Sequence, residues 1–125
     1  MSFTQDEKFL TMIASTDMRS HQHHVVELNA TDLKVELGAA KEGFGIVANN
    51  PNAGEAAMVA IDGVTLIRVG AAVTRGQWLT SAATGWGTQV TSGAAQNILG
   101  RVITGAASGM LASILLRVQR VNTAV

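Results

Sequence analysis

The sequence is poor in several features that mark common functional classes. It contains no cysteine, which excludes a disulfide framework and a metal site built on thiolates. Charged residues make up only 14% of the chain, and nine basic residues balance nine acidic ones. Because duplex binding needs a clustered basic surface, this balance argues against a nucleic-acid-binding protein. No apolar run approaches the roughly 18 residues of a membrane-spanning helix.

Other absences narrow the choice further. The first ten residues include acidic side chains and lack an apolar stretch beside a basic patch, so we expect no signal peptide. Hydrophobic residues make up 47% of the chain, too many for disorder throughout. A length of 125 residues fits one domain by the usual range of roughly 100–200 residues. Few charges and a net charge of zero favour a chain that sits in an assembly.

What the sequence does contain is a series of strand patterns separated by glycine, asparagine and proline. Residues 33–37 alternate apolar and charged side chains, which is typical of a strand with one buried face. Residues 113–121 also alternate, with Ile114 and Leu116 on one face and Leu115 and Arg117 on the other. Further strand patterns cover 25–28, 43–47, 55–62, 64–69, 79–82, 88–91 and 98–103.

Seven to nine strands at this spacing predict an all-β fold, a small compact β-sandwich or β-barrel of short strands with glycine-rich turns. At Gly63 the chain either joins two strands or forms a bulge within one. A competing interpretation places helix at 93–99 or 105–116, where alanine is common. Glycines within both stretches weaken it, because glycine costs a helix interior roughly 1 kcal/mol relative to alanine.

Residues 1–24 are expected to form an arm apart from a β-rich domain of residues 25–125. Thr4 and Glu7 have the spacing of a helix capping box. Phe9, Met12 and Ile13 would then share one helical face, although an extended arm is an equal alternative. In either form the arm should dock its apolar side chains on its own domain or on a neighbour. The candidate contact residues of the arm are Phe3, Phe9, Met12 and Ile13.

The sequence offers little for catalysis. His21, His23 and His24 could share a zinc ion with Asp17 or Glu27, but a solvated histidine-rich arm is the favoured interpretation, and we expect no metal site. There is no G-x-S-x-G nucleophile elbow and no phosphate-binding glycine loop. The acidic residues fall at wet strand positions or in turns, which suits solubility better than acid–base pairing. We therefore expect neither an enzyme nor a cofactor.

The two tryptophans are the remaining candidates for binding. Trp78 stands beside Leu79 and fits a core position, whereas Trp86 lies between two glycines at a predicted hairpin tip. A large apolar ring on an exposed tip usually contacts a partner. We expect Trp86 to contact a neighbouring subunit, with a sugar-binding platform as the alternative, and both Trp78 and Trp86 are candidate contact residues.

The stretch from Gly43 to Leu116 resembles the small capsid decoration, or cement, proteins of tailed bacteriophages. The resemblance lies in an ordered series of short phrases that combine strand residues with glycine turns. They are Gly45-Ile46-Val47-Ala48, Ala53-Gly54-Glu55, Val59-Ala60-Ile61-Asp62-Gly63-Val64, Gly70-Ala71-Ala72-Val73-Thr74-Arg75-Gly76-Gln77-Trp78-Leu79-Thr80-Ser81, Ile98-Leu99-Gly100-Arg101-Val102 and Ser113-Ile114-Leu115-Leu116.

This resemblance implies a β domain that binds the major capsid protein on the exterior of an expanded head and stabilises the shell. It implies a homotrimer at three-fold or quasi-three-fold positions, in a protein made in the host cytoplasm, with no catalysis and no cofactor. Deleting residues 1–24 should then leave a folded domain that binds the shell more weakly. The alternatives are another virion module, such as a head fibre base, tail tube or spike domain, and a sugar-binding module.

Overall fold

The computed structural model describes residues 2–39, 41–90 and 95–121. The described residues form nine strands and one short 3-10 turn, so the all-β prediction is confirmed. The strands are β1 (Gln5–Ala14), β2 (Val25–Leu28), β3 (Lys34–Leu37), β4 (Gly45–Val47), β5 (Ala56–Arg68), β6 (Trp78–Ser81), β7 (Gly87–Gln89), β8 (Gln96–Thr104) and β9 (Leu111–Val121), and the turn is η1 (Ala83–Gly85).

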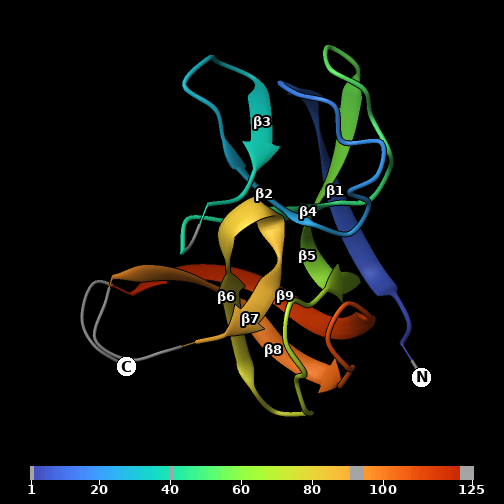
Figure 1. Ribbon diagram of the computed structural model, residues 1–125, viewed down its shortest axis with the longest axis vertical. Helices are drawn as coiled ribbons and strands as arrows, with labels where there is room; N and C mark the ends of the chain where they lie inside the picture. The colour runs from blue at the N-terminus through green and yellow to red at the C-terminus, as the bar shows by residue number, and fades with distance from the viewer. Residues whose placement is uncertain (1, 40, 91–94, 122–125) are drawn as a thin grey trace.

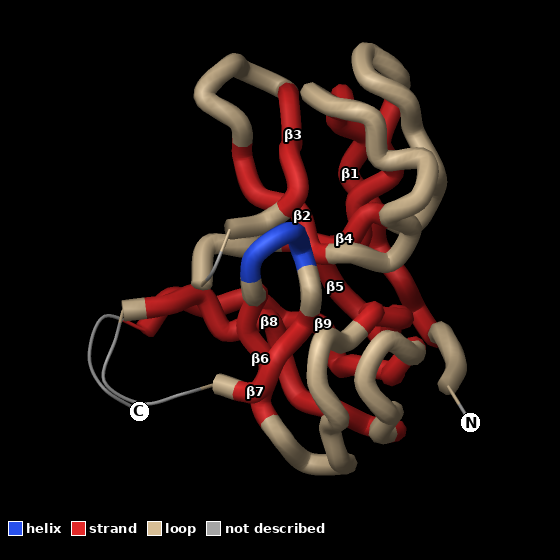
Figure 2. The backbone as a smooth tube through the Cα atoms, viewed as in Figure 1, coloured by secondary structure: helices blue, strands red, loops and turns tan. Residues whose placement is uncertain are grey.

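The strand pairings close two rings that share β5. In the N-terminal ring, β5 pairs with β1 and β4, and the pairings β1–β3, β3–β2 and β2–β4 complete the circuit. In the C-terminal ring the order is β5–β9–β8–β6–β7, and a bridge between Val69 and Gly87 returns β7 to the end of β5. Figures 1 and 2 show the N-terminal ring above and the C-terminal ring below.

The buried side chains form two hydrophobic cores. Strands β2, β4 and β5 contribute to both, because successive side chains of a strand point to opposite faces. The N-terminal core is built mainly from small side chains with Met18 among them: Ala14, Met18, Val26, Val35, Val47, Ala57 and Val59. The C-terminal core is larger and richer in leucine and isoleucine: Val25, Ile46, Ala60, Ile67, Val69, Val73, Leu79, Leu99, Val102, Ala112, Ile114 and Leu116.

The segment predicted as either a short helix or an extended arm is strand β1, so the helical alternative is wrong. β1 runs antiparallel to β5 from Gln5 to Ile13, with register shifts around Lys8. Glu7 does not cap a helix, because its carboxylate accepts a 2.6 Å hydrogen bond from the Thr65 hydroxyl of β5. The alternative helices at 93–99 and 105–116 are also wrong in the described part of the chain. β8 covers residues 96–99, β9 covers 111–116, and residues 105–110 contain a bridge and a turn.

Gly63 lies inside the single long strand β5, which settles the choice between two strands and one. Its φ of +94° belongs to the left-handed region that glycine adopts most easily. A Cβ atom at this position would lie 2.2 Å from the Asp6 carbonyl oxygen. Only glycine therefore lets β1 approach β5 where the register shifts.

Candidate functional site

The most distinctive exposed surface lies on the outer face of the C-terminal ring. Four side chains form a cross-strand row there, because Val64 of β5 is in register with Leu115, Leu115 with Arg101, and Arg101 with Trp78. Trp78 is 45% exposed and Leu115 is 43% exposed, although their sequence neighbours Leu79 and Leu116 are fully buried. We call this surface the Trp78 face and define it by Val64, Trp78, Arg101, Leu115, Arg117 and Gln119.

Arg101 and Trp78 hold each other in place on this face. The guanidinium carbon of Arg101 lies 5.4 Å from the centroid of the indole ring, which is a cation–π contact. The Arg101 Nε–H also donates a 3.0 Å hydrogen bond to the Gly76 carbonyl oxygen. Because one donor of the guanidinium is fixed by its own chain, the fork of the remaining donors is oriented on the surface.

Two shallow hollows flank Trp78. One, of about 370 Å³, is lined by Trp78, Gly100, Arg101, Leu115, Arg117 and Gln119. The other, of about 650 Å³, is lined by uncharged residues: Gly76, Gln77, Trp78, Gln89, Val90, Ile98 and Gln119. The indole therefore borders both an arginine-rich hollow and a neutral one.

The first hollow contains two arginines, and the neighbouring hollow that shares Arg117 with it is lined by Asp6 and Asp62. Arg101 and Arg117 are both exposed, and acidic side chains are absent from the lining of the first hollow. Among the described residues, the ion pairs within 4 Å are Arg19–Asp17 and Arg120–Glu42, and neither involves these two arginines. Asp62 is the register partner of Arg117 on β5, but its carboxylate accepts the backbone N–H of Gly63 at 2.8 Å.

The predicted contact residues of the arm lie elsewhere. Phe9, Met12 and Ile13 belong to β1 in the N-terminal ring, where Phe9 is 40% and Ile13 is 37% exposed and Met12 packs against the core. Phe3 is 39% exposed, and its backbone is tied to β9 through the hydroxyl of Ser113. Since β5, β9 and β8 separate β1 from β6 in the sheet order, these residues and Trp78 form two separate regions.

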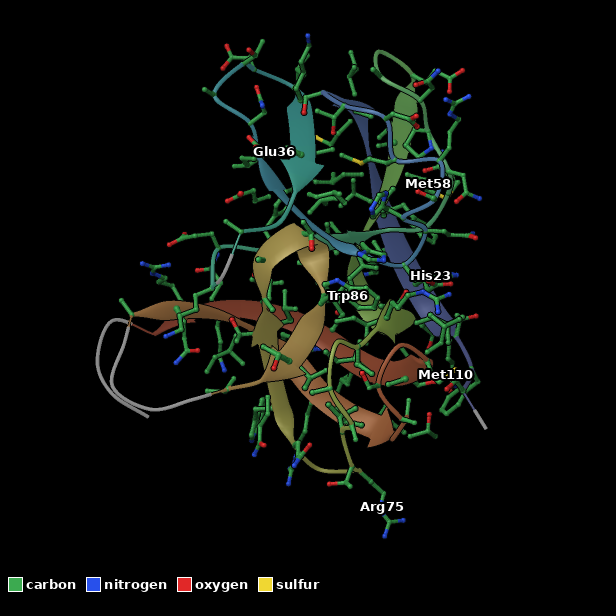
Figure 3. All side chains as sticks on the ribbon, viewed as in Figure 1. His23, Glu36, Met58, Arg75, Trp86 and Met110 are labelled. Atoms are coloured by element: carbon green, nitrogen blue, oxygen red, sulfur yellow. The ribbon has the colours of Figure 1, made fainter. Side chains whose placement is uncertain are left out.

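The exposure of the two tryptophans is the reverse of what the sequence suggested. Trp86 is half-buried rather than presented on an exposed tip, with its ring centroid 4.7 Å from that of His24 and its side chain against Gly70. Figure 3 shows it where the two rings meet. Trp78, for which the sequence also allowed a core position, is the more exposed of the two. Glycines on both sides suggested exposure for Trp86, but they serve close packing: a Cβ at Gly85 would lie 2.5 Å from the Val25 carbonyl oxygen.

The histidine cluster has a structural role. The imidazole Nδ1 of His24 lies 3.0 Å from the Thr84 carbonyl oxygen, which joins the start of β2 to the β6–β7 connection. Burial lowers the pKa of His24, and burial followed by the charge of Arg68 lowers the pKa of His23. Both rings therefore meet around imidazoles that favour the neutral form.

The described residues contain no group of three or more His, Cys, Asp or Glu side chains that could hold a metal ion. The two acids considered as ligands have other partners. Asp17 is bound by Arg19 at 2.8 Å, and the hydrogen bonds and charge of Arg19 lower the pKa of Asp17 to about 2. Glu27 accepts the backbone N–H of Ala39 at 3.0 Å.

The sequence contained a partial signal for the Trp78 face. The alternation in residues 113–121 placed Leu115, Arg117 and Gln119 on the face opposite Ile114 and Leu116, and the structure has this arrangement. Sequence reasoning missed Arg101 as their neighbour. Its position depends on the pairing of β8 with both β9 and β6, across a register shift near Gly100.

The fold and the Trp78 face define a small all-β protein that presents an aromatic and cationic surface. Residues 4–118 match the family of phage cement proteins, and the chain belongs to this family. The resemblance drawn from the glycine and strand phrases is thereby confirmed, and the chain is a structural component of a virion. No curated protein sequence matches the chain. In the described residues no helix is long and apolar enough to cross a membrane.

The fold is also similar to a solved structure, the crystal structure of the head fibre gp8.5 N base of bacteriophage phi29. The TM-score is 0.69, with 88% of this chain and 93% of that chain covered. The sequence identity is 13%, so this likeness concerns the fold.

Proposed function

We propose that this protein binds the exterior of an expanded phage capsid through the major capsid protein and stabilises the shell. Membership of the phage cement family supports this proposal. The single observation that carries it on the structural side is the exposed row of Trp78, Arg101 and Leu115. Tryptophan and arginine are the residue types most enriched among the side chains that dominate protein–protein affinity.

The protein would act as a homotrimer at three-fold or quasi-three-fold positions of the lattice. The N-terminal ring supplies a surface for contact between copies, since the outer face of β1 and β5 exposes Phe9, Ile13 and Met58. Interfaces between identical subunits are more apolar than transient ones, which suits these side chains. Trimerisation would also hide apolar surface on a chain of low charge.

Stabilisation would follow from the number of contacts. A trimer that bridges several capsid subunits converts its second and third contacts into intramolecular events, which raises the avidity of modest individual contacts. Copies bound across the closed lattice then resist separation of the capsid subunits that they bridge. The protein would be made in the host cytoplasm and added to the outer surface of the head.

A second candidate is the base of a head fibre. The observation in its favour is the similarity to the phi29 head fibre base over most of both chains. In that role the same domain would attach to the head and carry a further fibre segment, and shell stabilisation would be secondary. The two functions differ in whether binding increases the resistance of the head to heat.

Sedimentation with expanded, undecorated heads of the source phage tests both functions. We expect binding to saturate at a fixed, simple ratio of copies to major capsid subunits, and decorated heads to resist heat better than bare heads. Light scattering on the free protein would give the trimer mass. Saturable binding without added heat resistance would favour the fibre base, and no binding at micromolar concentration would contradict both functions.

A further inference from the structure

We propose that the Trp78 face is the surface that docks on the capsid, and that its partner there is an exposed capsid-protein segment presenting a carboxylate beside an apolar side chain. This inference rests on the proposed function and assigns its binding surface and the chemistry of its partner. Three properties of the face support it: an aromatic ridge, two arginines that form no ion pair within 4 Å among the described residues, and an Arg101 side chain held in place.

The ridge is the indole of Trp78. It stands between the two hollows, one of which is neutral and the other lined by Arg101 and Arg117. An apolar side chain of a partner can therefore lie against the indole, while a neighbouring polar group reaches the arginine-rich side. This combination of a large ring with flanking hollows is typical of the anchors at the centre of an interface.

The charge selects an anionic partner. Arg117 lies two residues beyond Leu115 on β9, and Leu115 is the register partner of Arg101, so the two arginines occupy diagonal positions on one sheet face. Diagonal neighbours lie roughly 7–8 Å apart. The two guanidinium groups repel each other at this distance. An anion that binds both of them reduces this repulsion. Arginine binds carboxylates with two parallel hydrogen bonds, which makes an acidic side chain the best fit.

Arg101 and Trp78 are held before binding. Arg101 is fixed by its hydrogen bond to Gly76 and by its stacking on Trp78. All members of the face except Trp78 lie on β5, β8 and β9, three strands joined by long antiparallel pairings. Little conformational freedom is then lost on binding, which favours affinity.

The N-terminal ring offers a different surface. Phe9, Leu10, Ile13 and Met58 are exposed there without an arginine pair among them. Met58 is the register partner of Thr11, and Ile13 of Ala56, so the side chains around them are uncharged, whereas Lys8 is the register partner of Asp62 further along β5. Such a surface matches a second copy of the chain better than an acidic partner, which leaves the Trp78 face for the capsid.

The test compares matched variants in the sedimentation assay with undecorated heads. Trp78→Ala removes the ridge, and its control is Met110→Ala, which truncates a 59% exposed apolar side chain at the β8–β9 turn. The double variant Arg101→Glu/Arg117→Glu reverses the charge of the face. Arg75→Glu is the charge-reversal control, because Arg75 is exposed, lines neither hollow and points away from the body of the protein (Figure 3).

We expect Trp78→Ala and the double reversal each to weaken binding by at least about tenfold, and both controls to remain within about twofold of wild type. Wild-type binding should weaken as salt is raised from about 50 to about 300 mM, whereas the double reversal should lose most of this dependence. Thermal unfolding checks that each variant is folded. If Trp78→Ala is not, Arg101→Ala tests the same face with the indole retained.

The outcomes separate the inference from the proposed function. If wild type saturates the heads and both face variants bind equally well, the Trp78 face is not the docking surface, although capsid binding stands. If the face variants bind heads normally but no longer self-associate, the face belongs to the contact between copies and the inference is wrong. If wild type does not bind heads, the proposed function and the inference fall together.

Discussion

The two rings share one strand but differ in how they use apolar side chains. Among the described residues, the C-terminal core buries twelve hydrophobic residues, including three leucines and three isoleucines, and the N-terminal core buries seven, with Met18 the largest. The N-terminal ring exposes Leu28 and Leu33 at 64% and 70%. The larger core therefore supports the face on which arginine and tryptophan are ordered, and the smaller ring leaves apolar side chains unpartnered.

The two rings therefore differ in stability and in the number of exposed apolar side chains, although they share β5. The first half of β5 pairs with β1 and β4, and the second half pairs with β9. A disturbance of the N-terminal ring should be tolerated by the C-terminal ring more easily than the reverse.

Removal of residues 1–24 is expected to have the largest effect. The boundary at residue 24 stays a prediction. The deletion removes β1, the buried residues Ala14 and Met18, and the contact of His24 with Trp86, so we now expect it to unfold the N-terminal ring rather than leave the whole remaining domain folded. We expect a loss of more than about 5 kcal/mol in unfolding free energy, beyond the usual range of single substitutions. Hydrogen exchange should show protection retained in β8 and β9 and lost in β2 to β4. Uniform loss of protection would show that the two rings unfold as one unit.

Truncation within each core comes next. Leu99→Ala in the C-terminal core and Met18→Ala in the N-terminal core each remove a fully buried side chain. Such substitutions cost about 2–5 kcal/mol, depending on how far the surroundings can collapse. We expect Leu99→Ala near the upper value and Met18→Ala near the lower, because Met18 lies outside the strands. Denaturant unfolding measures both, and a larger cost for Met18→Ala would reverse the ranking of the rings.

Gly63→Ala tests the shared strand. The substitution combines a left-handed φ with a Cβ placed 2.2 Å from the Asp6 carbonyl oxygen, so β1 must move. We expect a cost of about 1–3 kcal/mol, in the range of locally strained backbone. Gly54→Ala is the matched control, because Gly54 has a φ of +84° but open space around its Cβ position. Equal unfolding free energies for the two variants would show that only the dihedral angle matters, not the approach of β1.

The smallest expected effect is the loss of folding stability at acidic pH. Burial lowers the pKa of His23 and His24 below the ordinary value of 6.5. The unfolded chain therefore takes up protons near pH 6.5, whereas the folded chain takes them up only at lower pH. Stability should be complete above pH 6.5 and should fall as the pH drops below it.

The measurement is the melting temperature between about pH 7.5 and about pH 5. His24→Asn, which keeps a donor near Thr84, should flatten part of this dependence. His23→Asn should also flatten part of it, and asparagine tolerates the φ of +69° at that position, so the variant should fold. If the variants keep the full wild-type slope, other groups that titrate in this range control the contact between the rings.

Sequence alone predicted the strands whose period is regular. Residues 33–37 and 113–121 alternate strictly and form β3 and β9, because one face of each is buried against a core. β1 was not distinguished from a helix. Both faces of the strand carry apolar side chains, with Met12 against the core and Phe9 and Ile13 on the opposite, exposed face, so their spacing also matches a helix. The surroundings of the tryptophans depend on which strands pair. Those strands are far apart in the sequence, so a local pattern does not reveal the pairing.

The shared strand has a consequence for the order in which the protein forms during synthesis. β5 ends at Arg68, so every strand of the N-terminal ring precedes the chain that completes the C-terminal ring with β6 to β9. β9 pairs with β5 across about 50 residues, and β1 pairs with β5 across a similar separation, so the order of the two closures follows the order of synthesis. We expect the smaller ring to assemble first and to serve as the template on which the larger one closes. Pulse-labelled hydrogen exchange would then record protection of Val59 before that of Leu116.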